Sequence, residues 1–135
     1  MTLELTVSSF GYKFGAVSDA DWVIDSRMLR NPFWEPELRP LTGLDEPVRR
    51  FVLDQPEAER LLAWLIDMLR WSAPRYVDLG RPELHLAIGC TGGRHRSVVL
   101  AEALAARLGD DGIRTIVRHR DIDRPDSRYR QTPAS

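Results

Sequence analysis

The sequence contains one cysteine, Cys90, among its 135 residues. A single cysteine excludes an intrachain disulfide framework and a four-cysteine zinc site. The three histidines, His85, His95 and His119, do not have the spacing of paired metal ligands. We therefore expect neither a bound metal nor a cofactor.

An excess of either charge is also missing, because 19 lysines and arginines oppose 20 aspartates and glutamates, for a formal net charge of -1. No overall positive field attracts nucleic acid to such a chain, so any binding of RNA or phosphate must come from a local cluster. Lysine is nearly absent, since Lys13 is the only one. Arginine supplies the other basic side chains, and it is suited to bidentate recognition of phosphate.

Targeting and membrane-spanning patterns are not apparent. Residues 1–9 lack the basic start and the apolar stretch of a signal peptide. The most apolar helical stretch, Leu61–Leu69, is interrupted by Asp67 and is too short to cross a bilayer. We expect a cytoplasmic protein without a membrane partner.

What the sequence does contain is the composition of a globular protein, with 43% hydrophobic and 29% charged residues. Four runs predict strands: Leu3–Val7, Asp21–Asp25 (expected to be buried), Leu84–Ile88 and Ile113–Val117. Three segments predict helices: one capped by Asp45 that extends to Leu53, one that Pro56 opens, and Ser97–Leu108. These elements predict an α/β fold class, with a single domain over residues 1–122 and a mixed, mostly parallel sheet with flanking helices. The polar residues 123–135 are expected to form a flexible tail.

Nine consecutive residues, Gly89–Ser97, lie between a predicted strand and a predicted helix. At the carboxyl end of a strand in an open α/β sheet, the unpaired N–H groups of the following helix favour an anion. Gly92 and Gly93 permit a close backbone approach or a positive φ, and Arg94 and Arg96 add positive charge. The segment therefore predicts a phosphate-binding loop. Its candidate ligand-binding residues are Cys90, Thr91, Gly92, Gly93, Arg94, His95, Arg96 and Ser97.

The same loop has a Cys-x5-Arg-Ser spacing, from Cys90 to Arg96 and Ser97, which resembles the phosphate loop of cysteine-dependent phosphatases. In that chemistry a thiolate attacks phosphorus while the arginine and the loop amides hold the other oxygens. A lone cysteine is more often a small buried hydrophobe, and no signature singles out the carboxylic acid that must protonate the leaving group. We prefer a domain without catalytic residues, and a phosphatase that uses Cys90 and Arg96 is the alternative.

Two further polar clusters follow other predicted strands. Arg118–Asp121 follows the last strand, and Asp25, Arg27 and Asn31 follow the second. Parallel neighbouring strands would bring both clusters beside the loop at Cys90. The Asn31–Gly43 segment, with three prolines and two aromatic residues, Phe33 and Trp34, is expected to be an ordered loop near the same site. We expect one basic cleft, to which Arg27, Asn31, Arg118 and His119 contribute.

Several stretches occur in a recognisable order. They are Ser9-Phe10-Gly11-Tyr12-Lys13, Asp19-Ala20-Asp21, Asp25-x-Arg27 with Asn31-Pro32, Pro36-x-Leu38-Arg39-Pro40-x-Thr42-Gly43-Leu44-Asp45, Gly89-Cys90-Thr91-Gly92-Gly93-x-His95-Arg96-Ser97 and Arg118-His119-Arg120. In these residues the chain resembles the C-terminal domain of the RapZ/YvcJ family of RNase adapter proteins, and the resemblance covers about Ser9 to Asp121.

The resemblance implies an α/β domain similar to part of a phosphofructokinase. It implies a regulatory domain that senses the amino-sugar phosphate glucosamine-6-phosphate at the loop that ends at Ser97. It also implies binding of small regulatory RNAs, one of which the family presents to RNase E. A homo-oligomer is left open.

Two features of the family are missing from this sequence. The N-terminal nucleotide-binding domain with its Walker motifs is absent from this sequence, which is consistent with a natural standalone domain or with a truncated piece of a longer protein. In either case we expect no binding of ATP in the family's manner. The lysine-rich end associated with RNA binding is replaced by Arg118, Arg120, Arg124 and Arg128, with aspartates between them. Because RNA affinity depends on neutralising phosphates, a metabolite sensor is preferred over an RNA-binding adapter, and the phosphatase is third.

Overall fold

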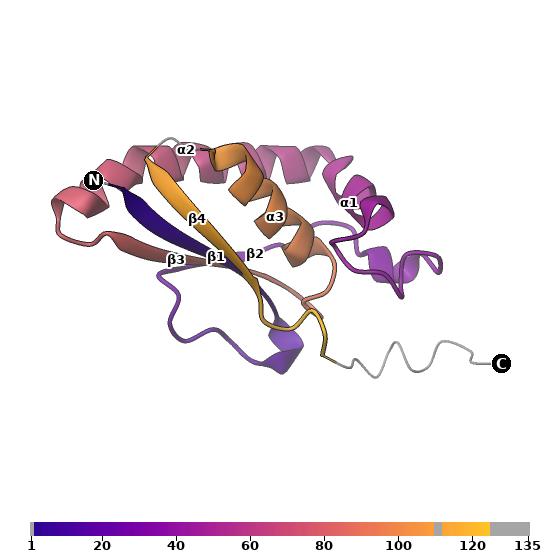
Figure 1. Cartoon of the computed structure of the whole chain (residues 1–135). Helices are drawn as coiled ribbons and strands as arrows, with labels where there is room; N and C mark the ends of the chain where they lie inside the picture. Colours follow the sequence, from indigo (N-terminus) through magenta and orange to yellow (C-terminus); the bar gives the residue numbers. More distant parts are fainter. Residues whose placement is uncertain (1, 110–111, 125–135) are drawn as a thin grey trace.

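Four strands form one sheet in the order β2-β3-β1-β4 (Figure 1). The strands are β1 (Leu3–Gly11), β2 (Trp22–Asp25), β3 (Glu83–Cys90) and β4 (Ile113–His119). All three neighbouring pairs are parallel. The computed structural model describes residues 2–109 and 112–124. Within these residues the predicted α/β class is confirmed, with a sheet that is wholly parallel rather than mixed.

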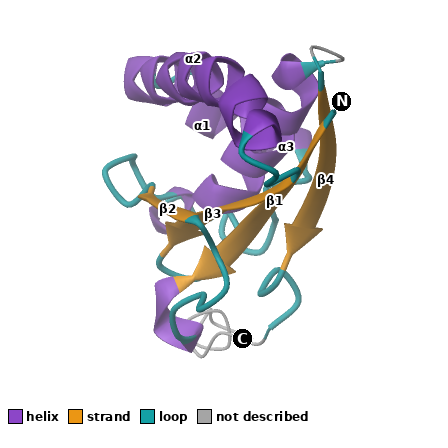
Figure 2. Cartoon of the chain, turned by 90° about the vertical axis from the view of Figure 1, so that its left-hand side faces the viewer, coloured by secondary structure: helices purple, strands orange, loops and turns teal. Residues whose placement is uncertain are grey.

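Three α-helices cover one face of this sheet. They are α1 (Glu46–Leu53), α2 (Pro56–Asp78) and α3 (Arg96–Leu108). Figure 2 shows the helices on one side of the strands, and the connection from β1 to β2 on the other side. This connection begins with a short 3-10 helix, Tyr12–Phe14. The domain therefore has one helix-covered face and one face that is only partly covered by a loop.

Alternation along β1 explains why the sheet has two different faces. Leu3, Leu5 and Val7 are fully buried and belong to the core, whereas Glu4 and Thr6 between them are partly exposed. Successive side chains of a strand point to opposite faces, so the first set meets the helices and the second set meets the other side.

The second strand is less buried than the sequence predicted. Trp22 and Ile24 pack against the core, but Val23 is 48% exposed and Asp25 is also exposed. The prediction of a buried strand is wrong because β2 is an edge strand, and only its helix-facing side has a neighbouring layer.

The helices begin close to their predicted positions. Asp45 is the N-cap residue of α1, but its carboxylate accepts a hydrogen bond from the Thr42 N–H (2.8 Å) instead of capping the helix. Helix α2 continues through Pro74 to Asp78, and its last four residues lie beyond a proline. One stripe of α2 is apolar and belongs to the core, and within this stripe Ile66 is partly exposed. The other members are Ala58, Leu61, Leu62, Leu65 and Leu69.

The loop over residues 31–43 is ordered by turns and by buried side chains, as predicted. Its first turn is a 3-10 helix, Pro32–Trp34, which is capped by a hydrogen bond from the Phe33 N–H to the Asn31 side chain (3.1 Å). Phe33 and Leu38 are buried, at 6% and 7% exposure. In the part of the chain that the structure describes, no helix has both the length and the apolarity needed to cross a membrane.

Candidate functional site

The loop between β3 and α3 lies at the carboxyl edge of the sheet. Cys90 is the last residue of β3, and Arg96 is the first residue of α3. Gly93 has a positive φ of 75°, one of the two roles that the sequence predicted for these glycines. The second role, a close backbone approach, is filled within the chain, since a Cβ added at Gly11 would lie 2.5 Å from the Gly92 carbonyl carbon. The end of β1 therefore packs directly on this loop.

Several predicted ligand residues of this loop point into the protein. Cys90 is 2% exposed, and its Sγ lies 3.1 Å from the Oγ of Ser97, which is fully buried. Gly92 and Gly93 are buried as well. This geometry gives the phosphatase alternative no support, because a nucleophilic thiol has to reach its substrate.

His95 is also turned inward. It is 3% exposed, and its Nε2–H donates a hydrogen bond to the carbonyl oxygen of Leu41 (2.7 Å). Burial lowers the pKa of His95 to about 4; hydrogen bonds with the backbone oppose the shift, and the positive charge of Arg94 adds to it. At neutral pH the imidazole is therefore uncharged, and it holds the 31–43 loop rather than an anion.

Arg94 also holds the 31–43 loop in place. Its guanidinium donates hydrogen bonds to the carbonyl oxygens of Ile122 (2.9 Å) and Pro40 (3.3 Å). The Arg94 carbonyl in turn accepts a hydrogen bond from the Gly43 N–H (2.8 Å). These contacts join the β3–α3 loop to the 31–43 loop and to the segment after β4.

Thr91 and Arg96 are the members of the loop that reach a groove on the surface. The Arg96 guanidinium, although only 4% exposed, donates hydrogen bonds to the carbonyl oxygens of Arg27 (3.1 Å) and Leu29 (2.8 Å) and lies 3.5 Å from the Thr91 hydroxyl. Contacts with the backbone that follows β2 thus occupy part of the guanidinium that was predicted to contact a phosphate. One function of Arg96 is to fix the wall of the groove.

The groove has a volume of about 650 Å³ and lies between the β3–α3 loop and the start of the 31–43 loop. It brings together Thr91 and Arg96 with Arg27 and Asn31, two of the neighbours expected from the sequence. Its lining residues are Arg27, Leu29, Arg30, Asn31, Trp34, Glu35, Phe51, Thr91 and Arg96.

Charge within the groove is mixed. Arg27 makes a two-pronged contact with Asp25, with nitrogen–oxygen distances of 2.7–3.1 Å, and lies over the Tyr12 ring at 3.9 Å. The hydrogen bonds from Arg27 hold the pKa of Asp25 below its usual value, and the charges of Arg27 and Arg96 act in the same direction. Arg30 lies over the Phe51 ring at 5.0 Å. The groove therefore offers arginines beside carboxylates and an exposed tryptophan, Trp34.

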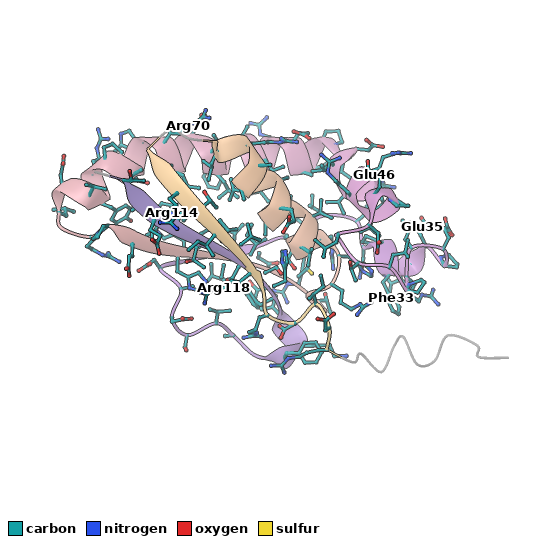
Figure 3. All side chains as sticks on the ribbon, viewed as in Figure 1. Phe33, Glu35, Glu46, Arg70, Arg114 and Arg118 are labelled. Carbon is teal, nitrogen blue, oxygen red and sulfur yellow. The ribbon has the colours of Figure 1, made fainter. Side chains whose placement is uncertain are left out.

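Two residues of the predicted cluster Arg118–Asp121, namely Arg118 and His119, lie away from this groove. Arg118 and His119 line a separate pocket of about 520 Å³ together with residues of β1, β3 and the β1–β2 connection. Figure 3 shows Arg118 beneath the strands, whereas Phe33 and Glu35 lie on the distant 31–43 loop. The expectation of one basic cleft is wrong because β1 lies between β3 and β4 in the sheet.

The arginines expected to bind RNA are largely engaged with Asp121. This carboxylate is fully buried, accepts a hydrogen bond from the Gly11 N–H (2.7 Å), and pairs with both Arg120 and Arg124 at 2.9 Å. Arg128 lies outside the described residues, as does most of the predicted tail. Among the residues described here, no group of three or more histidine, cysteine, aspartate or glutamate side chains is arranged to hold a metal ion.

The fold and the groove define the class of the protein: a small α/β domain with an arginine-containing groove at the carboxyl edge of a parallel sheet. The chain belongs to the RapZ C-terminal domain family, whose model matches residues 3–123. This confirms the resemblance seen in the sequence.

Two longer relatives carry the name nucleotide-binding protein. The chain is 52% identical over 122 residues to a "Nucleotide-binding protein" of Desulforudis audaxviator, and 50% identical over 122 residues to "Nucleotide-binding protein SCO1952" of Streptomyces coelicolor. Each match covers 90% of this chain, but 42% and 41% of the two relatives. The chain thus spans about two fifths of the length of these relatives.

Five residues of the groove lining were not among the predicted site residues: Leu29, Arg30, Trp34, Glu35 and Phe51. Arg30 lies between two residues of the predicted cluster but was not distinguished from other surface arginines. Glu35 and Phe51 come from the 31–43 loop and from α1, and no spacing links them to Thr91. The proline-rich, aromatic composition of the 31–43 loop was the available signal, and it indicated the loop but not the individual side chains.

Proposed function

We propose that this domain is a regulatory module that binds a phosphorylated amino sugar, of which glucosamine-6-phosphate is the first candidate, in the groove between Arg27 and Arg96. The observation that carries the proposal is the convergence of Thr91 and Arg96 with Arg27 and Asn31 around one groove. Two segments far apart in the sequence contribute these residues, one after β2 and one after β3. The family resemblance implies these same four residues for the ligand site or its surroundings.

The chemistry of the groove suits both ends of such a ligand. Arg30 and the groove-facing part of Arg96 would pair with phosphate oxygens, and the Thr91 hydroxyl would donate a further hydrogen bond. Glu35 supplies a carboxylate for the amino group, and the exposed Trp34 offers a flat surface to the sugar ring.

The test is isothermal titration calorimetry with glucosamine-6-phosphate, glucose-6-phosphate, glucosamine and inorganic phosphate. We expect the amino-sugar phosphate to bind most tightly. Arg30→Ala should weaken binding by about 2 kcal/mol, or roughly thirtyfold in Kd, because a charge-assisted hydrogen bond is lost. Arg30 is exposed, so the fold should be unaffected.

Arg49→Ala is the matched control, because Arg49 is an exposed arginine on α1 that pairs with Glu46 and does not line the groove. Glu35→Gln should reduce the preference for glucosamine-6-phosphate over glucose-6-phosphate. Arg96→Ala is less informative, since it also removes the hydrogen bonds to Arg27 and Leu29. Equal binding of both sugar phosphates, or no binding of either, would overturn the proposal.

A further inference from the structure

The pocket beneath the sheet contains a serine in direct contact with a histidine. Ser8 Oγ of β1 lies 2.7 Å from Nε2 of His85, which is on the neighbouring strand β3. Both side chains line the pocket of about 520 Å³, which is separate from the groove described above. Ser8 is 7% exposed, so its hydroxyl is sheltered from bulk water but still borders the pocket.

The surroundings of His85 fix which of its nitrogens carries the proton. Nδ1 lies 3.3 Å from the carbonyl oxygen of Asp19 and 3.8 Å from the Asp19 carboxylate. A carbonyl oxygen only accepts hydrogen bonds, so in the neutral ring Nδ1 carries the proton. Nε2 then has the free lone pair, and Ser8 must donate its proton to it.

The position of His85 is also fixed through its backbone. Its N–H donates to the Asp21 carboxylate (2.8 Å), and its carbonyl accepts from the Asp21 N–H (2.8 Å). Arg81 pairs with the same carboxylate at 2.8 Å. Asp21 therefore fixes the backbone of His85, and Asp19 fixes its ring, so that Nε2 faces Ser8.

A positive charge lies beside this pair. Arg118 is the register partner of Ser8 on β4 and lines the same pocket. Within residues 2–109 and 112–124, no hydrogen bond or ion pair occupies its guanidinium. It can therefore stabilise a negative charge that develops on a substrate oxygen.

We propose that Ser8 is an activated nucleophile, with His85 as its general base, and that this pocket hydrolyses small carboxylic esters. The serine–histidine contact, the carbonyl and carboxylate of Asp19 behind the histidine, and an unengaged arginine are the parts that acyl transfer requires. The inference does not depend on the proposed sugar-phosphate site.

The reaction balances without a cofactor. Ser8 Oγ attacks the carbonyl carbon and forms a C–O bond, while its proton moves to His85 Nε2 and the carbonyl electron pair moves to oxygen near Arg118. Collapse of this intermediate breaks the bond to the alcohol, which leaves with the proton from His85. Water then adds to the acyl carbon as His85 takes its proton, and Ser8 departs and regains a proton. The net products are a carboxylic acid and an alcohol.

The test is labelling of the chain with a small fluorophosphonate, with the labelled serine located by fragmentation mass spectrometry. We expect label on Ser8, and a labelling rate that falls by about a hundredfold in His85→Gln because the general base is lost. The chain contains a matched control: Ser9 lies 2.6 Å from His119, which in turn contacts Glu102 at 2.7 Å. Ser9 is fully buried, so it should remain unlabelled in the folded chain.

Hydrolysis of p-nitrophenyl acetate gives the second readout, and Ser8→Ala should abolish it. Absence of label on Ser8, or a rate that His85→Gln does not change, would overturn the proposal. Labelling without ester turnover would overturn the hydrolytic activity. If His85→Gln does not fold, the comparison of folded with urea-unfolded chain decides: label on Ser8 in the folded chain alone supports the proposal, and equal labelling overturns it.

Discussion

Arg94, His95 and Arg96 are three consecutive polar residues whose side chains all bond to backbone carbonyl oxygens of other segments. The carbonyls of Leu29, Pro40 and Leu41 lie in the stretch between β2 and α1, which contains no α-helix or strand of its own, whereas the Ile122 carbonyl follows β4. Turns pair some of the carbonyl groups of this stretch with backbone N–H groups, and these side-chain donors satisfy others. A substitution of one of these three residues therefore alters the groove indirectly, by releasing the backbone that forms the groove wall.

His95 provides the clearest prediction at this scale. Its pKa of about 4 in the folded chain lies below the unfolded value of 6.5, so the unfolded state binds more protons between these pH values. Stability is therefore complete above pH 6.5 and is lost as the pH falls towards 4. From pH 8 to pH 5 the loss due to His95 should be about 2 kcal/mol, measured as the free energy of urea unfolding.

His95→Gln is the informative variant, because its side-chain amide can still donate to the Leu41 carbonyl but does not titrate. The variant should be less stable at pH 8 but should lack this part of the slope between pH 6.5 and pH 5. The carboxylates whose pKa is lowered, Asp21, Asp25 and Glu59, lose their contributions at lower pH, below about 4.5. Equal slopes in the two proteins would show that His95 is not the group responsible.

The sequence predicted where the site lies but not which way its residues point. A strand, a glycine-containing turn and a helix start can be read from Gly89–Ser97, and the structure has this arrangement. The direction of Cys90, His95 and Arg96 depends on the segments packed over the loop, and those segments are 50 to 70 residues away in sequence for the contacts of His95 and Arg96. Spacing within a motif contains no information about such partners.

At the scale of elements, local hydrophobic patterns were sufficient to locate a strand or helix that packs one face against the core. The alternation of Leu3, Leu5 and Val7 located β1, and the heptad-like spacing of leucines located α2. The order of the strands was not predictable in the same way, because a parallel connection can pass over a neighbouring strand. The wrong expectation of one cleft arose from this limit.

Pro74 in α2 leads to a prediction about the stability of an element. The proline lies inside the helix, is exposed, and cannot donate a hydrogen bond to the carbonyl of Arg70 one turn earlier. Pro74→Ala should restore that bond and raise the free energy of unfolding by about 1–3 kcal/mol, partly offset by a more flexible unfolded chain. Calorimetry should show an increase of several degrees in Tm.

Pro56→Ala is the matched control, because Pro56 occupies the first position of the same helix, where an N–H has no helical partner. Its Tm should change little. A lower Tm for Pro74→Ala would indicate that the proline ring, rather than the helix geometry, stabilises this end of α2.

For the whole molecule, two polar cavities lie on different parts of the same sheet. The groove at residues 27–35 and 91–96 belongs to the carboxyl edge, and the pocket at Ser8 and His85 lies beneath the strands. The strand order separates them, so a ligand in one does not compete for the side chains of the other. Such a domain can bind a metabolite in the groove and carry out a separate reaction in the Ser8–His85 pocket.

The balanced charge of the whole chain leads to the last prediction, which concerns RNA. Arg120 and Arg124 neutralise the buried Asp121. Among the described arginines that were expected to bind RNA, Arg118 is therefore the one that no ion pair engages. Together with Arg128 and Arg130 of residues 125–135, at most about three phosphates would be neutralised. The logarithm of the binding constant for single-stranded RNA should then fall with the logarithm of salt concentration with a slope no steeper than about −2. Fluorescence anisotropy between 50 and 200 mM salt measures this slope directly, and over this range such a slope gives a loss of affinity of less than about twentyfold.

Arg118→Ala should make the slope shallower by about 0.7, whereas Arg124→Ala should lower the stability of the fold without changing the slope. A slope steeper than about −3 would require more phosphate contacts than these arginines provide, and would make the arginines of the groove part of an RNA surface.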